Sequence, residues 1–399
     1  MENSVENAAE NSTENGAQAE TKTDAKARFT VSKTDTLAIK AVAVMMMVIH
    51  HTFGFPERLA EGVGYDSMMS LRGGQPLEFM LGSFGKLCVA LFMLLSGFGM
   101  YRSYLNRKRE NGEVSFTQMI VKRIKNVYIK WWQILIIFGL IGLWLGAANI
   151  PTDSAVWLKN LLVIDTGMYP EAWFLVPYLI TMCLFPLIIR WFERKHANMW
   201  VDAVFIFLLN TIVISLIIPT VSKYECLAVL CGSFFYQRII VTLATLSMFM
   251  AGCFLAKYNV IERIRACFDY GYIAKLVGLV MIATVYVIRQ NMLMPVQWGW
   301  DTLDFFYAAV FTIGMLLLLD GLNLIKKFLA FIGKQATGIW LIHAFFCYYY
   351  FQKFTYSFRN PILIFLFLMV VSSLLSWVIG LILSGIWSLL KRGVKKAPV

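Results

Sequence analysis

The chain is built from long apolar runs that are separated by short polar segments. An α-helix needs about 20 consecutive apolar residues to cross a bilayer core, and ten runs of about that length occur. They lie at 37–56, 79–101, 127–147, 172–190, 199–219, 239–257, 271–289, 302–322, 335–352 and 361–388. Because a helix satisfies its own backbone hydrogen bonds, as a lipid environment requires, this pattern predicts an all-α polytopic membrane protein with about ten transmembrane helices.

The connections between these runs alternate in charge, which predicts the orientation. Lysine and arginine are retained on the cytoplasmic side of short connections. They cluster at 102–130, 190–195, 257–265, 326–327 and 391–396, whereas 153–171, 223–238, 291–301 and 352–360 are poorer in them. Ten spans with both termini in the cytoplasm place every cluster on the cytoplasmic side.

Composition agrees with a membrane protein and limits the classes of partner. Hydrophobic residues make up 59% of the chain and charged residues 15%, well outside the range of soluble domains. The net charge of +12 follows from the cytoplasmic clusters, so we expect a lipid bilayer as partner and no nucleic acid. We expect a multi-pass protein of the cell membrane, either plasma or inner.

Both ends of the chain differ from the apolar centre. Residues 1–34 are rich in Glu, Asn, Ala and Thr and have no apolar periodicity, which predicts a disordered cytosolic tail. The segment is acidic and lacks a cleavage site, so it is not a signal peptide. Residues 391–399 are expected to be a basic cytosolic tail, which leaves 35–390 as the membrane domain.

Two adjacent histidines, His50 and His51, are the most unusual feature of the first apolar run, and Lys40 precedes them. Polar groups are costly in hydrocarbon, so ionisable residues there are candidates for function. Adjacent helical residues point about 100° apart, so at most one histidine can face a given site squarely. The alternative is that both are neutral histidines packed against other helices; two together with a lysine below them favour a functional role.

A few other polar or aromatic residues lie within or beside the apolar runs. Ser96 precedes Gly97, a pair that permits close helix approach; Trp173 begins the fourth run; and His343 lies in the ninth. An interfacial tryptophan is commonly an anchor. The seven cysteines are scattered and form no Cys/His metal-ligand spacing, so we expect no metal site.

Taken in order, five segments resemble the acyltransferase-3 family of integral membrane O-acyltransferases. The first is KAVAVMMMVIHH, with a basic residue at Lys40 and a histidine eleven positions on at His51. The others are LFMLLSGF at 91–98, KRIKNVYIKWW at 122–132, WFL at 173–175 and GKQATGIWLIH at 333–343. Lysine stands at position 40 where many members have arginine, which keeps the charge but loses the bidentate fork.

The resemblance implies transfer of an acyl group, usually acetyl from acetyl-CoA, to a hydroxyl of a sugar or other cell-surface acceptor such as exopolysaccharide. An imidazole can take the proton from the attacking alcohol, which accelerates such steps by about 10²- to 10⁴-fold. The resemblance therefore implies His51 as the general base, with His50 as the second candidate. Ser96 is first a packing residue and only secondly a candidate acyl carrier, while Trp173 and His343 are expected near substrate or behind the base.

The phosphates of CoA call for cations on the cytoplasmic side. Lys40, Arg123 and Lys125 are the expected partners; for each one alone, ordinary cytoplasmic positive charge is an equal explanation.

Two other functions remain open from sequence. Intramembrane histidines and lysine also suit a proton-coupled secondary transporter, and a non-catalytic ligand-binding membrane module is the third. Acyl-CoA consumption by the purified protein distinguishes the enzyme from both.

Overall fold

The computed structural model describes residues 30–71, 74–224, 226, 229, 233–268, 271–293 and 303–394. Its described residues form helices and connections, with no strand among them beyond an isolated bridge between Ser70 and Pro76. In chain order the elements are α2 (Lys33–Phe53), η1 (Pro56–Arg58), α3 (Leu77–Gly85), α4 (Cys88–Asn111), α5 (Phe116–Leu145), α6 (Ser154–Leu161), η2 (Pro170–Phe174), α7 (Leu175–Phe192), α8 (Met199–Thr211), η3 (Ile212–Ile217), α9 (Ile218–Lys223), α11 (Phe234–Lys257), α12 (Val260–Cys267), α13 (Tyr272–Leu293), α14 (Asp304–Leu319), α15 (Asn323–Ala344), η4 (Phe345–Tyr349), α16 (Gln352–Ser357) and α17 (Pro361–Val394).

The predicted spans correspond to these helices. Nine segments of the described chain are long and apolar enough to cross a membrane. The eighth predicted run, 302–322, forms α14, which has 16 residues and a length of about 24 Å at 1.5 Å per residue. The all-α polytopic fold is therefore confirmed, while the side on which each terminus lies stays a prediction.

Several helices extend beyond their apolar runs. Helix α5 begins at Phe116 and α15 at Asn323, because a helix continues into the interface where water can solvate its polar side chains. The second predicted span is interrupted between α3 and α4, at Lys86 and Leu87.

The predicted tails fall largely outside the described residues. Residues 1–29 and 395–399 are not among those described, so the disorder of the N-terminal tail and the cytosolic location of both tails stay predictions. Helix α2 begins at Lys33, where Ser32 caps it in a capping box with Asp35, and α17 continues to Val394.

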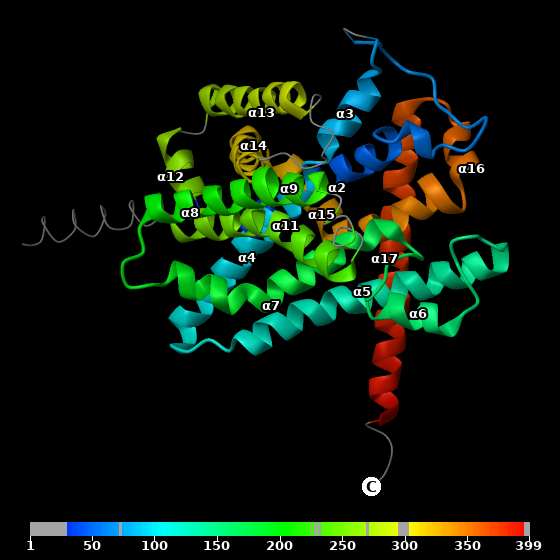
Figure 1. Ribbon diagram of the computed structural model, residues 1–399, viewed down its shortest axis with the longest axis horizontal. Helices are drawn as coiled ribbons and strands as arrows, with labels where there is room; N and C mark the ends of the chain where they lie inside the picture. Colours follow the sequence, from blue (N-terminus) through cyan, green and yellow to red (C-terminus); the bar gives the residue numbers. More distant parts are fainter. Residues whose placement is uncertain are drawn as a thin grey trace, which may run out of the picture.

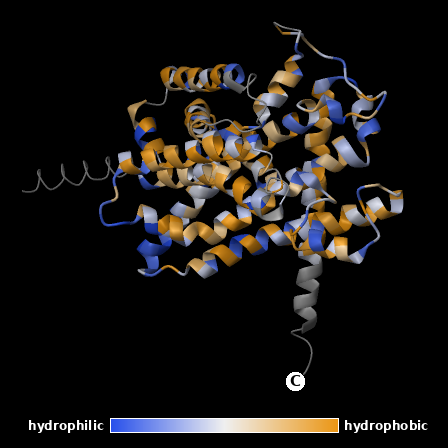
Figure 2. Ribbon diagram, in the orientation of Figure 1, coloured by the Kyte–Doolittle hydropathy of each residue, from blue (hydrophilic) through white to orange (hydrophobic). Residues whose placement is uncertain are grey.

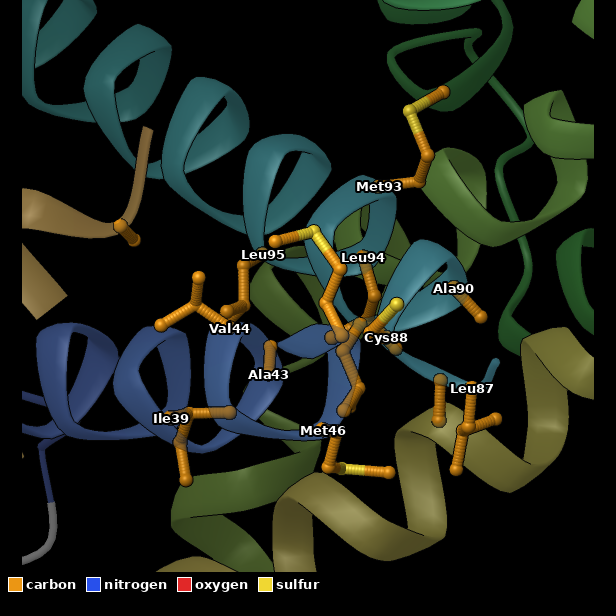
Figure 3. Close-up of a cluster of buried hydrophobic side chains, with 14 of the residues drawn as sticks. Ile39, Ala43, Val44, Met46, Leu87, Cys88, Ala90, Met93, Leu94 and Leu95 are labelled. Carbon is orange, nitrogen blue, oxygen red and sulfur yellow. The ribbon is translucent and has the colours of Figure 1, made fainter. Parts of the chain in front are cut away.

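The core lies where α2 packs against α3, α4 and α15, and where α4 packs against α11. Figure 3 shows the apolar side chains that α2 and α4 contribute, among them Ile39, Val44 and Leu94, all fully buried. In Figure 1, α5, α7, α8 and α11 run across the view, whereas α17 runs at a steep angle to them in the right-hand part of the view. Polar residues gather in the connections at the left and right edges of this view (Figure 2).

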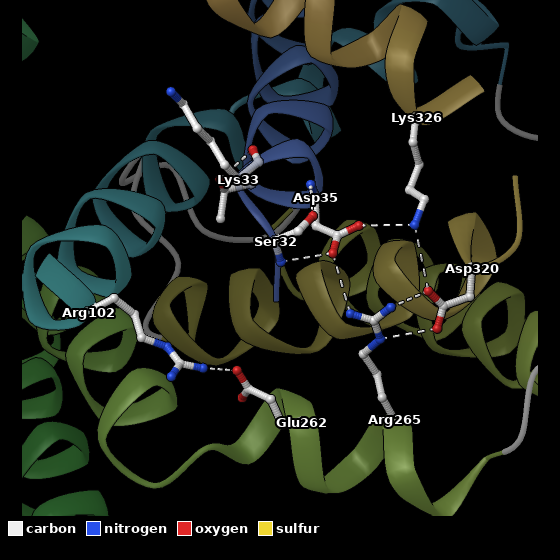
Figure 4. Close-up of polar contacts among 9 residues, drawn as sticks. Ser32, Lys33, Asp35, Arg102, Glu262, Arg265, Asp320 and Lys326 are labelled. Atoms are coloured by element: carbon white, nitrogen blue, oxygen red, sulfur yellow. Dashed lines mark hydrogen bonds and ion pairs between the residues drawn. The ribbon is translucent and has the colours of Figure 1, made fainter. Parts of the chain in front are cut away.

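Ion pairs fasten the N-terminal end of α2 to its neighbours (Figure 4). The Arg265 guanidinium, 2% exposed, bonds Asp320, with Nε 3.1 Å from Oδ2, and lies 3.5 Å from Asp35. Lys326 reaches Asp35 at 3.2 Å. Buried charges are tolerated only when paired, so this network fixes the start of α2 against α12 and α15.

Candidate active site

A cavity of about 540 Å³ lies between α2, α4, α5, η2 and α15. Both histidines of α2 line it, together with Lys40 nearer the start of the same helix. Lys40 and His51 are eleven residues apart, which is about 16 Å of helix. The cavity therefore extends along the length of α2 and brings the predicted basic residue and histidine pair to one space.

His51 forms a hydrogen bond with a histidine from the opposite part of the chain. Its Nδ1 lies 2.7 Å from Nε2 of His343, and the two rings are within 6° of parallel. The Nδ1 of His343 lies 2.7 Å from the carbonyl oxygen of Trp340. A carbonyl only accepts, so His343 carries its hydrogen on Nδ1 when neutral and accepts from His51 at Nε2.

This chain of bonds sets the tautomer of His51. Since its Nδ1 donates to His343, the neutral ring of His51 keeps its lone pair on Nε2. The nitrogen that can accept a proton is therefore Nε2, on a ring that lines the cavity. His343 is fully buried and is not among the cavity-lining residues.

His50 is held in a different direction. Its Nδ1 lies 2.7 Å from the carbonyl oxygen of Gly82 on α3, and its ring contacts Phe55 with 4.8 Å between centroids. Glycines 54 and 85 pack closely against it, since a Cβ built on Gly85 would lie 3.0 Å from the His50 Cβ. The two histidines thus point to different helices, as their adjacency predicts.

A second cavity of about 820 Å³ adjoins the first and is strongly basic. The two share Lys40, Arg123, Val127, Tyr178 and Thr337. Six basic side chains and no carboxylate occur among its described lining residues; the six are Lys40, Arg107, Lys122, Arg123, Lys130 and Lys334. Two of the three predicted phosphate partners, Lys40 and Arg123, therefore lie at the junction, whereas Lys125 is exposed and lines neither cavity.

Ser96 and Trp173 also line the first cavity. The Ser96 hydroxyl donates to the carbonyl of Phe92 at 2.7 Å. Gly97 follows it and faces α11, where a built Cβ would lie 2.9 Å from the carbonyl carbon of Phe249. The expected close approach of helices at Ser96–Gly97 is therefore present.

Three further charged residues that line this cavity were not singled out from sequence as site residues: Arg58, Lys86 and Glu171. Arg58 bonds Glu171 at 2.6 Å, and their side chains are 35% and 3% exposed. Burial lowers the pKa of Arg58, but Tyr348 and Glu171 outweigh it, so the net pKa is raised and the residue stays charged. Glu171 stands two positions before Trp173, and an acidic residue at the start of an apolar run was the available signal.

Comparison with known proteins gives the family. The sequence model of the acyltransferase-3 family, which describes an acyltransferase domain, matches residues 38–381. This range includes the helices around both cavities. No curated protein and no solved structure matches the chain. The chain therefore belongs to the acyltransferase-3 family and is a polytopic membrane acyltransferase.

Proposed function

We propose that this acyltransferase takes an acyl group, most simply acetyl, from acyl-CoA and transfers it to a hydroxyl of a cell-surface carbohydrate or a related acceptor. One observation carries the proposal: a histidine-lined cavity and a basic cavity meet at Lys40 and Arg123. Acyl-CoA has a phosphorylated nucleotide end and a reactive thioester. It therefore needs a basic cavity for the phosphates next to a histidine-lined cavity for the thioester.

The basic cavity suits the nucleotide end of the donor. CoA carries several phosphates, and lysine and arginine bind phosphate by charge-assisted hydrogen bonds. Lys40 and Arg123 at the junction, with Arg107, Lys122, Lys130 and Lys334 beyond them, are the cations that we assign to this end. Lys125 does not line the cavity and is given no part in it.

His51 is the proposed general base. Its Nε2 accepts the proton of the acceptor hydroxyl as the oxygen attacks the acyl carbon, and CoA leaves as the thiol after that proton is returned to sulfur. His343 Nε2 accepts a hydrogen bond from His51 Nδ1 throughout the reaction, so His343 holds the His51 ring in the required tautomer. His50 is tethered to Gly82, and we assign it a supporting role.

Purified protein with radiolabelled acetyl-CoA tests the proposal. Wild type is expected to release CoA and to transfer label to a crude cell-envelope glycan extract. No consumption of acetyl-CoA, with other acyl-CoAs also inert, would contradict the proposed donor. The plasma or inner membrane is the proposed location, and immunodetection in separated membranes checks it.

A further inference from the structure

Glu171 is the one carboxylate among the described residues that line the histidine cavity. Four cations face the same space: Lys40, Arg58, Lys86 and Arg123. Glu171 is 4% exposed, and a buried carboxylate is stable only with partners. Binding of the donor does not explain why a carboxylate lies in this mostly positive cavity, because a carboxylate repels phosphate. Glu171 is therefore expected to have another role.

The hydrogen-bond partners of the Glu171 carboxylate leave part of its accepting capacity unused. Arg58 Nη2 donates to Oε1 at 2.6 Å, and the Tyr349 hydroxyl donates to Oε2. A carboxylate has about four acceptor positions, so each oxygen of Glu171 retains room for one more donor. Because the residue lines the cavity, those positions are available to a bound hydroxyl.

Arg58 lies beside Glu171 and contacts an aromatic ring. Its guanidinium lies 3.6 Å from the centre of the Tyr348 ring. The Gln352 side chain fixes the surrounding segment, since it donates to the Arg58 carbonyl at 3.0 Å and accepts from the Ala60 amide at 2.9 Å. A guanidinium has five N–H donors, so Arg58 can bind an oxygen in addition to Glu171.

The position of this pair separates it from the donor end. Arg58 follows the C-terminal end of α2, whereas Lys40 lies near its start, with His51 between them. Trp173 and Trp340 line the same cavity. An adjoining carboxylate and guanidinium with aromatic faces suit a neutral ring that bears several hydroxyls, since the carboxylate accepts from hydroxyls and the aromatic rings pack against C–H surfaces.

We infer that Glu171 and Arg58 form the acceptor subsite, in which they bind hydroxyls next to the one that reacts at His51. The inference rests on the proposed function and names the acceptor class as a neutral pyranose with neighbouring hydroxyls. Glu171 also offsets the positive charge of Arg58 at this end, whereas the described residues that line the basic cavity beyond Lys40 and Arg123 include no carboxylate, so the phosphates of the donor are favoured at the other end.

Steady-state kinetics with two substrates test the subsite. Methyl glucoside, galactoside and mannoside serve as probes at saturating acetyl-CoA, with CoA release as the signal. Loss of a hydrogen bond to a charged group costs about 1.5–3 kcal/mol, which is about 10- to 100-fold. Glu171→Gln and Arg58→Gln are expected to raise the KM for the best glycoside by that factor, with a far smaller change in the KM for acetyl-CoA.

Deoxy analogues sharpen the test. Wild type is expected to reject the monodeoxy glycoside that lacks the neighbouring hydroxyl, whereas Glu171→Gln is expected to treat the parent and deoxy compounds alike. The matched control is Arg359→Gln, which removes an exposed ion pair with Asp66 outside the cavity. Unchanged discrimination in Glu171→Gln, or equal rises in KM for both substrates, would overturn the inference.

A second variant and a direct binding measurement cover the cases in which Glu171→Gln does not fold or wild type does not use acetyl-CoA. If Glu171→Gln does not fold, Glu171→Asp keeps the charge but withdraws it by one methylene, and the glycoside KM is still expected to rise. If wild type does not use acetyl-CoA, the proposed donor fails, and titration calorimetry with the glycosides alone decides. Binding that Glu171→Gln loses supports the subsite; equal binding by both proteins, or none by either, contradicts it.

Discussion

The Nδ1 atom of His51 lies 2.7 Å from Nε2 of His343, although 292 positions separate the two residues. The pair joins α2 to α15, and the Trp340 carbonyl holds the far side of His343. A base whose tautomer is set by hydrogen bonds is ready to accept a proton at a defined atom.

His51→Ala is expected to reduce the turnover of acetyl-CoA by about 10²- to 10⁴-fold, because the general base is removed. His50→Ala is expected to lose less turnover, since the His50 ring bonds a backbone carbonyl. Its main effect is a decrease of about 1–3 kcal/mol in the free energy of unfolding. Turnover and thermal unfolding in detergent measure both. His196→Ala, at an exposed position, is the control, and equal losses in all three would remove the special role of His51.

His343→Leu is expected to lower kcat about tenfold or more while leaving both KM values close to wild type, because an acceptor for His51 is lost and the ring can adopt the other tautomer. His343→Gln supplies a side-chain oxygen as acceptor and is expected to recover part of that loss. The comparison of the two kcat values is the measurement. A rise in KM without change in kcat would instead indicate a role in substrate binding.

Lys334→Gln and Arg107→Gln are each expected to raise the KM for acetyl-CoA by about 3- to 10-fold, through loss of a charged contact to phosphate. The same variants should use S-acetyl-N-acetylcysteamine, a thioester without the nucleotide, as well as wild type does. Lys353→Gln on α16 controls for removal of a surface charge. A similar loss with both donors would show that the basic cavity does not bind phosphate.

Gly252→Ala is expected to destabilise the protein by about 1–3 kcal/mol, as overpacking does. A Cβ built there would lie 2.7 Å from the Phe98 amide nitrogen, so α4 and α11 would have to separate. In the control Gly385→Ala, the new Cβ meets no described atom within 4 Å, and helix propensity predicts a small gain. Thermal unfolding in detergent distinguishes the two; equal midpoints would mean that this close approach contributes little.

Glu193 provides a pH dependence outside the spans. Burial raises its pKa, but hydrogen bonds from Lys108 and Tyr101 outweigh that, and the net pKa is lowered. A lowered folded-state pKa stabilises the protein above the unfolded value of about 4.3, and this contribution is lost as pH falls through the folded-state pKa.

The expected result is that the unfolding midpoint of wild type falls more steeply below pH 5 than that of Glu193→Gln. Melting curves between pH 7 and pH 3 measure this. Glu110→Gln, at an exposed position, should follow wild type. Parallel curves for wild type and Glu193→Gln would mean that these bonds do not lower the Glu193 pKa relative to the unfolded chain.

The sequence by itself determined the membrane class, the all-helical fold and where along the chain the spans lie, although α5 and α15 begin 11 and 12 residues before the predicted runs at 127 and 335. The reason is that lipid permits only structures that satisfy their own backbone hydrogen bonds, so apolar length alone predicts a helix. It also pointed to Lys40 and to the histidine pair, because ionisable groups in such runs are costly.

Only the tertiary structure decided which groups meet. The Arg58–Glu171 bond joins residues 113 positions apart, and the break at Lys86 interrupts a run that reads as continuous. Lys125 belongs to a basic motif but lies outside both cavities, since its position around α5 turns it to the exterior. Partners and directions depend on how helices distant in sequence pack, and local patterns of polar and apolar residues do not encode that packing.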